Sequence, residues 1–391
     1  MMTMNSTEAW VIHRGPDKFA KHVPGELRRE EYQFSELSPD EVLVEPIYGC
    51  WEGNMTHALE RRPVDICRQR NEDRLILGNT GVVRALKAGP AVHGVREGDP
   101  CIVFGTAETD QRGYPVRILA YDAPGTMGVL AKRVKLSARS LLPVPQHTRY
   151  SLRHWAAFSG RYVTAWSNWK VAYGCWRVQM SEEDLPGPSI WGWGGGSAFA
   201  ELSLAQHHGW RASMIAGRDE RLRLIKSHGM DAVDRRWFGD LSFDEVRYAS
   251  DRDYQQEYQA AEERFLALVR EGTGGEGVAI FVDHLGAPVT RATLRALGRQ
   301  GVLTTAGWKC GMRTSSVRAL ECINRHIHVH THYSRYSEGR AAIEAGERMG
   351  WMPPLADDER VYQWDEIPTL ARDYAAGTID SYFPLFQVNS L

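Results

Sequence analysis

The sequence has no long apolar run, little net charge and few cysteines. No segment approaches the roughly 18 consecutive apolar residues that a membrane span needs. Lys and Arg total 47 and Asp and Glu total 49, which gives a formal net charge of −2 at pH 7. This balance gives no electrostatic reason to expect nucleic acid or a membrane as a partner. Residues 1–8 lack the basic start and apolar core of a signal peptide, so we expect a cytoplasmic protein.

The cysteines are scattered, and no two of them form a Cys-x-x-Cys pair. Neither a disulfide framework nor a four-cysteine zinc lobe is indicated, and we expect reduced, buried thiols. Tryptophan, by contrast, is abundant at 13 residues, which indicates core packing or the lining of an apolar pocket. The six cysteines are Cys50, Cys67, Cys101, Cys175, Cys310 and Cys322.

Length and patterning predict two domains of different character. The chain has 391 residues, of which 43% are hydrophobic and 25% charged, an ordinary globular balance. In the first 150 residues, short apolar runs at 42–48, 81–86 and 99–104 are separated by glycine and proline. Strands at this spacing predict a partly open β-barrel.

After Pro145 the pattern changes to alternating strands and helices. This alternation predicts a doubly wound parallel sheet. A polar insertion is expected at 236–258, before a helix at 259–270, and the tail after Asn324 is too short for a complete domain and is expected to return to the first domain. The strand and helix patterns, in chain order, are 188–191, 199–208, 211–216, 220–228 and 231–233.

A strand, a glycine cluster and a helix follow one another at 188–208, the order that a dinucleotide-binding turn requires. Gly192 permits the tight turn, Gly195 and Gly196 leave room for a pyrophosphate, and Ala198 allows close packing of helix on strand. The first N–H groups of the helix are then available to phosphate. A flexible glycine linker is the alternative interpretation.

The end of the second strand, at 216–221, carries no carboxylate at its tip. A carboxylate there usually binds the free 2′-hydroxyl of NAD. Arg218 and Arg221 lie just beyond the tip instead, and a guanidinium suits a 2′-phosphate, so the sequence favours NADPH. Alternatively, both arginines are solvated residues at a helix start.

Together these features resemble the medium-chain dehydrogenase/reductase superfamily. The resemblance implies an α/β fold with a GroES-like, partly open β-barrel catalytic domain and a Rossmann domain with a doubly wound parallel sheet. The expected boundaries are 1–160 for the catalytic domain, with 331–391 returning to it, and 161–330 for the NADP-binding domain. The segments that carry the resemblance are Glu41–Val44, Leu77–Val83 and Val95–Asp99.

Within the superfamily the chain is most similar to crotonyl-CoA carboxylase/reductases and related enoyl-thioester reductases. This resemblance implies NADPH as cofactor, Thr164 among the cofactor contacts, and a small-molecule substrate linked as a thioester to CoA or a carrier protein. It also implies a homodimer. The segments that carry it are Arg117–Asp122, Gly125–Gly128, Tyr254–Thr273, Asp283–Gly286 and His330–Tyr333.

The zinc ligands of the superfamily are replaced in this sequence. Glu52 stands at the cysteine ligand, and Gly78-Asn79-Thr80 stands where Gly-His-Glu is usual. Amide and hydroxyl oxygens bind zinc poorly, so no metal is expected. Without a Lewis acid, hydride addition to an electron-poor C=C is favoured over alcohol oxidation, because hydrogen-bond donors suffice to stabilise the resulting enolate.

Three residues are candidates for the chemistry. Asn54 aligns with an active-site asparagine of the subfamily and is expected to bind a substrate carbonyl, unless it only forms a turn. His332 aligns with an active-site histidine and is a candidate proton donor. Glu52 is either a general acid, if burial raises its pKa, or inert because it is paired with an arginine. His154 stands where carboxylating members carry a glutamate, which argues against CO2 fixation.

Histidines occupy alternate positions of 326–332, so on a strand they would share one face. Such a face could bind a metal, or it could simply be a partly exposed face of the sheet. The leading interpretation of the whole chain is an NADPH-dependent, zinc-independent enoyl-thioester reductase. The alternatives are a ketone, quinone or imine reductase, a reductive carboxylase, and a non-catalytic nucleotide-binding protein.

Overall fold

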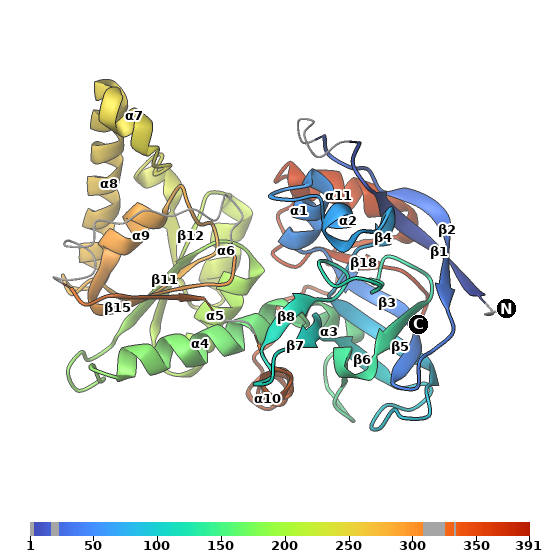
Figure 1. The fold of residues 1–391 in the computed structure, drawn as a ribbon. Helices are drawn as coiled ribbons and strands as arrows, with labels where there is room; N and C mark the ends of the chain where they lie inside the picture. The colour runs from blue at the N-terminus through green and yellow to red at the C-terminus, as the bar shows by residue number, and fades with distance from the viewer. Residues whose placement is uncertain (1–3, 17–22, 308–324, 332–333) are drawn as a thin grey trace. The chain divides into compact units, whose positions relative to one another are not determined.

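The computed structural model describes residues 4–16, 23–307, 325–331 and 334–391 (Figure 1). The chain divides into two compact units: unit 1 is Met1–Val163 with Ser334–Leu391, and unit 2 is Thr164–Tyr333. The division falls within helix α4 (Arg161–Arg177). In the part of the chain that is described, no helix is long and apolar enough to cross a membrane.

Unit 1 is built mainly from β-strands, as the sequence predicts for the first 150 residues. Its strands are β1 (Met4–His13), β2 (Arg28–Ser35), β3 (Glu41–Cys50), β4 (Arg74–Ile76), β5 (Gly81–Ala88), β6 (Pro100–Val103), β7 (Thr106–Thr109), β8 (Pro115–Ile118), β9 (Val134–Ser137), β10 (Leu141–Pro143), β17 (Val361–Tyr362) and β18 (Leu385–Gln387). Its helices are α1 (Gly53–Glu60), α2 (Ile66–Arg70), α3 (Leu152–Phe158), α10 (Tyr336–Met349) and α11 (Ile367–Ala375), with single 3₁₀ turns at Ala138–Ser140 and Trp364–Glu366.

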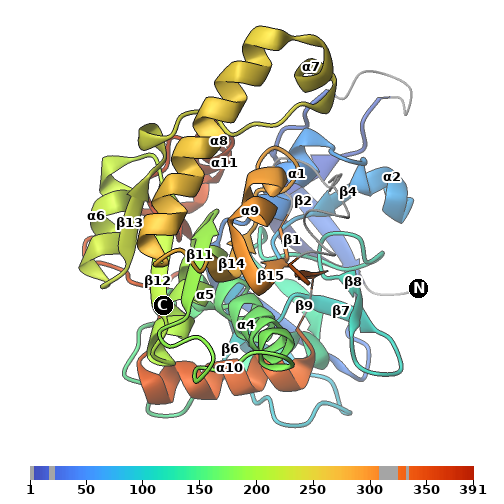
Figure 2. The same cartoon turned by 90° about the vertical axis from the view of Figure 1, so that its left-hand side faces the viewer.

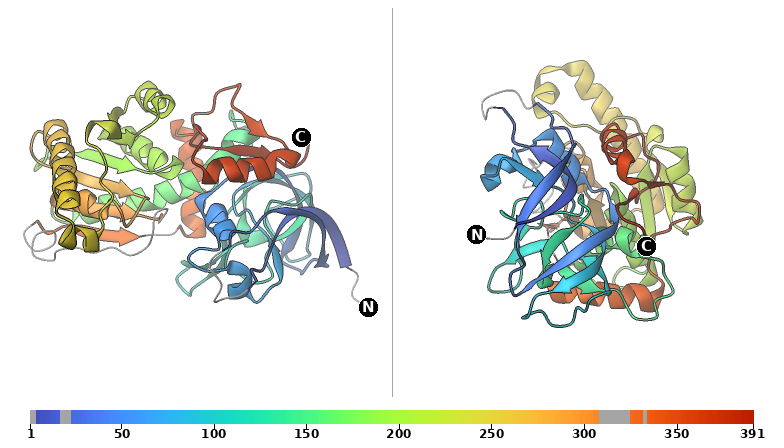
Figure 3. Two further views of the ribbon diagram at one scale, coloured as in Figure 1. Left: turned by 90° about the horizontal axis from the view of Figure 1, so that it is seen from above. Right: turned by 90° about the vertical axis from the view of Figure 1, so that its right-hand side faces the viewer.

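The central sheet of unit 1 runs in the order β10-β6-β5-β3-β18-β17, and β9 also pairs with β3. Strand β3 therefore lies in the middle, and its residues from Ile47 to Cys50 are all buried. The C-terminal strand β18 is antiparallel to β3, with Leu385 opposite Cys50. The core under these strands includes Val42, Val44 and Phe386. The right half of Figure 3 shows the ribbon of unit 1 with its strands toward the viewer. The end of β3, which leads into α1, is thus held from both sides.

Unit 2 is a six-stranded, fully parallel sheet in the order β13-β12-β11-β14-β15-β16. The chain adds strands toward one edge of the sheet from β11 to β13 and toward the other edge from β14 to β16. Doubly wound sheets bind ligands at this switch in strand order, between β11 and β14. Its strands are β11 (Ser189–Trp193), β12 (Arg211–Ala216), β13 (Asp231–Asp234), β14 (Val278–Asp283), β15 (Leu297–Thr305) and β16 (His328–Thr331). Its helices besides α4 are α5 (Gly196–His207), α6 (Asp219–Ser227), α7 (Glu245–Ser250), α8 (Arg252–Gly272) and α9 (Thr290–Ala296), with a 3₁₀ turn η2 at Arg235–Trp237.

One expectation for unit 2 is wrong: the polar stretch before residue 259 is largely helical. Helix α8 begins at Arg252, where the Asp251 side chain caps it by accepting from the Tyr254 N–H at 3.1 Å. Its buried face starts at Tyr258 and continues through Phe265, which packs on the sheet. Figure 2 shows α8 as a long helix with α7 at its far end. The polar residues cover the exposed face of a long amphipathic helix, and they hide its periodicity in the sequence.

Candidate functional site

The glycine turn of unit 2 lies between β11 and α5, next to the switch in strand order between β11 and β14. Gly195 caps α5 without a side-chain hydrogen bond, and a Cβ added to it would meet no atom within 4 Å. Gly194 has φ +137°, a conformation that glycine adopts readily. A Cβ on Gly192 would lie 2.9 Å from Leu202 on α5. The first N–H groups of α5, which starts at Gly196, therefore open onto space suited to an anion.

Two further residues were predicted to contact the cofactor, Ala198 and Thr164. Ala198 is fully buried on the first turns of α5, and its Cβ would be 3.6 Å from a Cβ on Gly194. Thr164 is half-buried on α4, at the start of unit 2. The residues present therefore fit a dinucleotide pyrophosphate, since glycine and alanine leave the approach to the helix open.

Arginines gather where β12 and β13 end. Arg218 caps α6, and Arg221 lies in the first turns of that helix. Arg235 opens η2, and its side chain lies so close to Gly217 that a Cβ there would clash with its Nε. Sequence reasoning missed Arg235, because it follows the third strand rather than the second. The Arg235-Arg236 pair directly after β13 was the available signal.

Arg236 binds two carboxylates near these strand ends, those of Asp234 and Asp219. Its Nε donates to the Asp234 carboxylate at 2.8 Å, and its Nη2 lies 2.5 Å from Asp219. Hydrogen bonding to Arg236 holds the pKa of Asp234 below its usual value. Four arginines, Arg218, Arg221, Arg235 and Arg236, thus stand near the two acids that Arg236 binds.

In unit 1, the segment after β3, where the sequence predicts no metal ligand, holds an ion pair. Glu52 follows β3 and caps α1, and its Oε1 accepts from Arg161 Nη1 at 2.7 Å. The same guanidinium donates to Cys50 Sγ at 2.7 Å and to the Trp51 carbonyl at 2.6 Å. The Arg161 side chain is only 3% exposed. Burial raises the pKa of Glu52, and the charge of Arg161 opposes that rise.

The conditions named for the two alternative roles of Glu52 are both met: burial raises the pKa of its carboxyl, and an arginine binds it. Arg161 was missed by sequence reasoning, and the only signal was a basic residue at the start of an otherwise apolar helix after Gly160. Pairing with an always-charged guanidinium favours the ionised carboxylate over a free acid.

These residues do not fit zinc. The Glu52 oxygen that would face a metal already binds a cation, and the Thr80 hydroxyl donates to the Cys50 carbonyl at 2.8 Å. Asn79 offers a buried Oδ1 without a hydrogen-bond partner, but an amide oxygen is a poor zinc ligand. Within the described ranges, no three His, Cys, Asp or Glu side chains are grouped to hold a metal.

The remaining candidates are Asn54, His154 and His332. Asn54 is half-buried in the first turn of α1, and its Oδ1 is buried without a hydrogen-bond partner. His332 lies outside the described residues. His154 is on α3, with its Nδ1 2.8 Å from the Ser151 hydroxyl, and desolvation lowers its pKa.

Only part of the histidine run forms a strand. β16 contains His328 and His330, whereas His326 precedes it with φ +54°. His328 Nε2 lies 3.3 Å from the Gln300 side-chain oxygen. The fourth histidine is the undescribed His332, so the described strand presents two of the four.

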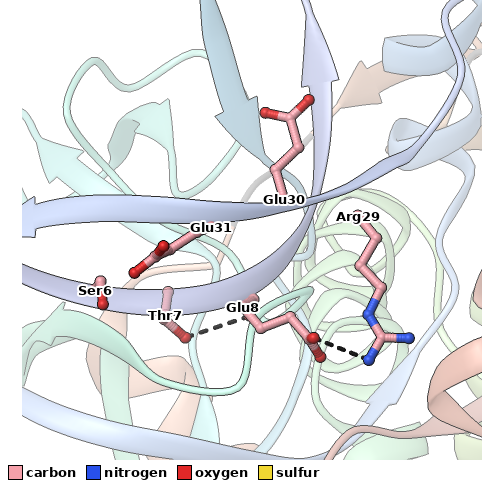
Figure 4. Close-up of a pocket in the computed structure, with 6 residues that line it drawn as sticks. All are labelled: Ser6, Thr7, Glu8, Arg29, Glu30 and Glu31. Atoms are coloured by element: carbon pink, nitrogen blue, oxygen red, sulfur yellow. Dashed lines mark hydrogen bonds and ion pairs between the residues drawn. The ribbon is translucent and has the colours of Figure 1, made fainter.

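A pocket of about 430 Å³ lies on β1 and β2 of unit 1 (Figure 4). Its acidic residues are largely paired: Glu8 binds Arg29 at 2.8 Å, and Glu30 binds Arg74 at 2.9 Å. None of the predicted site residues lines it. The full lining is Ser6, Thr7, Glu8, Arg29, Glu30 and Glu31.

Neither a protein-family model nor a curated protein sequence matches the chain. Solved structures do. The 2-octenoyl-CoA carboxylase reductase CinF from a Streptomyces species, in complex with NADP and 2-octenoyl-CoA, is 17% identical over 97% of this chain and 87% of its own, with a TM-score of 0.78. The crotonyl-CoA carboxylase/reductase AntE in complex with NADP is 20% identical over 98% and 95%, also with a TM-score of 0.78.

An alcohol dehydrogenase from Aeropyrum pernix has the same architecture. It is 19% identical over 97% of this chain and 100% of its own, with a TM-score of 0.73. At such identities the likeness establishes the fold. The expected α/β class, with a GroES-like unit and a Rossmann unit, is confirmed.

Proposed function

We propose that the protein is an NADPH-dependent, zinc-independent reductase that adds hydride to the activated C=C of an enoyl thioester. The observation that carries this proposal is the Glu52–Arg161 ion pair, at 2.7 Å, in the place where zinc-dependent enzymes of this fold bind their metal. Alcohol oxidation by these enzymes depends on a Lewis acid, whereas reduction of an electron-poor alkene needs only hydrogen-bond donors at the developing oxyanion.

The cofactor would be held by unit 2. The N–H groups at the start of α5, from Gly195 and Gly196 onward, would bind the pyrophosphate, with Thr164 as a further contact. Arg218, Arg221 and Arg235 would bind the 2′-phosphate, which suits the guanidinium fork. Support also comes from the similar carboxylase/reductases, which were solved in complex with NADP.

Bound NADPH supplies the hydride that adds to the β-carbon of the alkene. The task of this chain is to bind the thioester carbonyl and stabilise the negative charge that develops on its oxygen. We assign that task to the Asn54 amide N–H, a donor that acts without a metal. Because Glu52 is bound by Arg161, we assign protonation of the α-carbon to His332 or to water.

We also propose that protonation prevails over carboxylation. In the similar subfamily a glutamate helps to hold CO2, and this chain has His154 at that position. Its imidazole, hydrogen-bonded to Ser151 at 2.8 Å, cannot supply the paired acceptor oxygens of a carboxylate. We also propose a homodimer, as the resemblance implies, which light scattering coupled to size-exclusion chromatography tests.

The test is NADPH oxidation by the purified protein with a panel of enoyl-CoA and carrier-protein thioesters, in the presence of labelled bicarbonate. The expected product is the saturated, unlabelled thioester. A mainly carboxylated product would identify a reductive carboxylase. Turnover only with ketones, quinones or imines would contradict the substrate class. NADPH binding without any turnover would indicate a non-catalytic nucleotide-binding protein.

A further inference from the structure

Three buried polar side chains meet next to the glycine turn of unit 2. Asn168 on α4 and Glu201 on α5 are fully buried, and His284, which follows β14, is 9% exposed. Among the described residues, Nε2 of His284 has no hydrogen-bond partner, and the Glu201 carboxyl has only the neighbouring Asn168 amide. Buried polar groups without partners are rare and cost stability, so a cluster of them points to a function.

The hydrogen bond to Ala306 settles the proton position on His284. Its Nδ1 accepts from the Ala306 backbone N–H at 3.2 Å, so the proton of the neutral ring is on Nε2. That Nε2–H faces Glu201 Oε2 at 4.0 Å. An Nε2 that carries its proton is a donor and cannot ligate a metal. The geometry is that of a histidine donor and a carboxyl acceptor.

Burial keeps both partners neutral. It lowers the pKa of His284 to about 4, and it raises the pKa of Glu201 well above its usual value, a rise that the Asn168 amide opposes. Within the described part of the chain, no further charged group contributes to either shift. The nearest other acid, Asp283, accepts from the backbone N–H groups of Leu285 and Gly286 instead.

His284 also links the ends of three strands. The backbone N–H of His284 lies 3.5 Å from the Trp193 carbonyl at the end of β11. A Cβ added to Gly194 would lie 3.2 Å from the Cβ of His284. Ala306, the donor to its ring, directly follows β15. In a doubly wound sheet, a dinucleotide lies across the switch point, so its adenosine half lies toward β12 and β13 and its nicotinamide half toward β14 and β15.

We propose that Glu201 and His284 form a buried, uncharged hydrogen-bonded pair that positions the ends of β14 and β15 for the nicotinamide half of the dinucleotide. Both are positioning residues, and the inference rests on the proposed NADPH binding. A direct bond requires the 4.0 Å gap to close by roughly 1 Å. Hydrogen bonds in unliganded sites are often long and tighten when the ligand binds.

Two ligands separate the halves of the cofactor in the test. The dissociation constants of NADPH and of adenosine 2′,5′-bisphosphate, which lacks the nicotinamide half, are measured for the wild type, Glu201→Leu and Glu201→Gln. Glu201→Leu should weaken NADPH about tenfold, the effect of one lost hydrogen bond, and leave the bisphosphate unchanged. Glu201→Gln should bind both ligands as the wild type does at neutral pH, because an amide keeps a donor and an acceptor.

The pH profile gives a readout that mere packing would not move. Burial raises the pKa of Glu201, and its ionisation would leave an uncompensated charge in the buried pair. As pH rises through that pKa, the wild type should therefore bind NADPH progressively less well while binding of the bisphosphate stays flat. Glu201→Gln has no proton to lose and should show no such decline. Gln206→Leu, on the same helix but hydrogen-bonded to Gly229, is the matched control and should bind both ligands normally.

Equal losses for both ligands in Glu201→Leu, or no loss for either, would overturn the positioning role. The positioning role would also be overturned if NADPH binding by Glu201→Gln weakened with rising pH as it does in the wild type. If Glu201→Leu does not fold, the pH comparison of the wild type with Glu201→Gln decides the matter alone. A wild type that binds the bisphosphate and NADPH equally poorly would instead overturn the proposed function, and the inference with it.

Discussion

Each unit buries a glutamate next to its site residues, and the two solve the problem of a buried acid in opposite ways. Glu52 in unit 1 is compensated by the guanidinium of Arg161 at 2.7 Å. Among the residues that the structure describes, Glu201 in unit 2 faces a neutral histidine and an amide instead of a cation. A buried charge is tolerated when it is paired, and an unpaired group instead shifts its pKa and stays neutral. The two sites should therefore respond oppositely to replacement of the carboxyl by an amide.

The largest effect is expected at Arg161. Arg161→Leu leaves Glu52 buried without its cation and removes three hydrogen bonds to the end of β3, so it should lower the free energy of unfolding by about 3–5 kcal/mol. Urea unfolding followed by tryptophan fluorescence measures this. Arg161→Lys, which keeps the charge but not the fork, should lose less. A loss below about 1 kcal/mol in Arg161→Leu would show that the pair is energetically unimportant.

The next effect concerns the cofactor. Arg218→Ala and Arg235→Ala should each weaken NADPH binding by about 1–3 kcal/mol while leaving NADH nearly unaffected, because only NADPH carries the 2′-phosphate. Isothermal titration with both cofactors checks this. Arg223→Ala, which removes an exposed arginine of α6 paired with Glu220 at 3.0 Å, is the control. Equal losses for both cofactors would mean that the arginine is structural.

The two glutamates themselves give the sharpest contrast. Glu52→Gln leaves Arg161 without its counter-charge and should destabilise the protein by about 1–3 kcal/mol at neutral pH. Glu201→Gln should stabilise it, increasingly so as pH rises from acid to neutral. The sign follows because the unfolded glutamate ionises in this range while the buried one stays protonated, so only the wild type loses stability with rising pH. Thermal unfolding of both variants across this range measures the contrast, and the same sign for both would refute the comparison.

The smallest effect expected is none at all. Because the Glu52 carboxylate is already bound by Arg161, treatment with a chelator should leave both stability and NADPH-dependent activity unchanged, and elemental analysis should find no stoichiometric zinc. One metal per chain together with loss of activity on chelation would contradict this. It would also direct attention to the histidines of 326–332.

The fold follows from local patterns, and the site residues largely do not. Alternating strands and helices and the glycine turn predicted the parallel sheet, because each depends on neighbouring residues. The partners of Glu52 and Glu201 lie far away along the chain, and Arg161 is 109 residues from Glu52. No periodicity relates such residues. A single acid in the apolar stretch 198–202 was the one local sign that Glu201 is special.

The pairing of β18 with β3 bears on how the chain reaches this structure. Unit 2 is one continuous stretch, whereas unit 1 is assembled from two stretches that flank it. Strand β3 therefore gains its neighbour β18 only after the whole of unit 2 has been synthesised. Contacts between distant segments form slowly, and unpaired strand edges promote aggregation. During synthesis, unit 2 is free to fold early, while the strand that leads to Glu52 stays exposed on one edge and dependent on chaperones for longer.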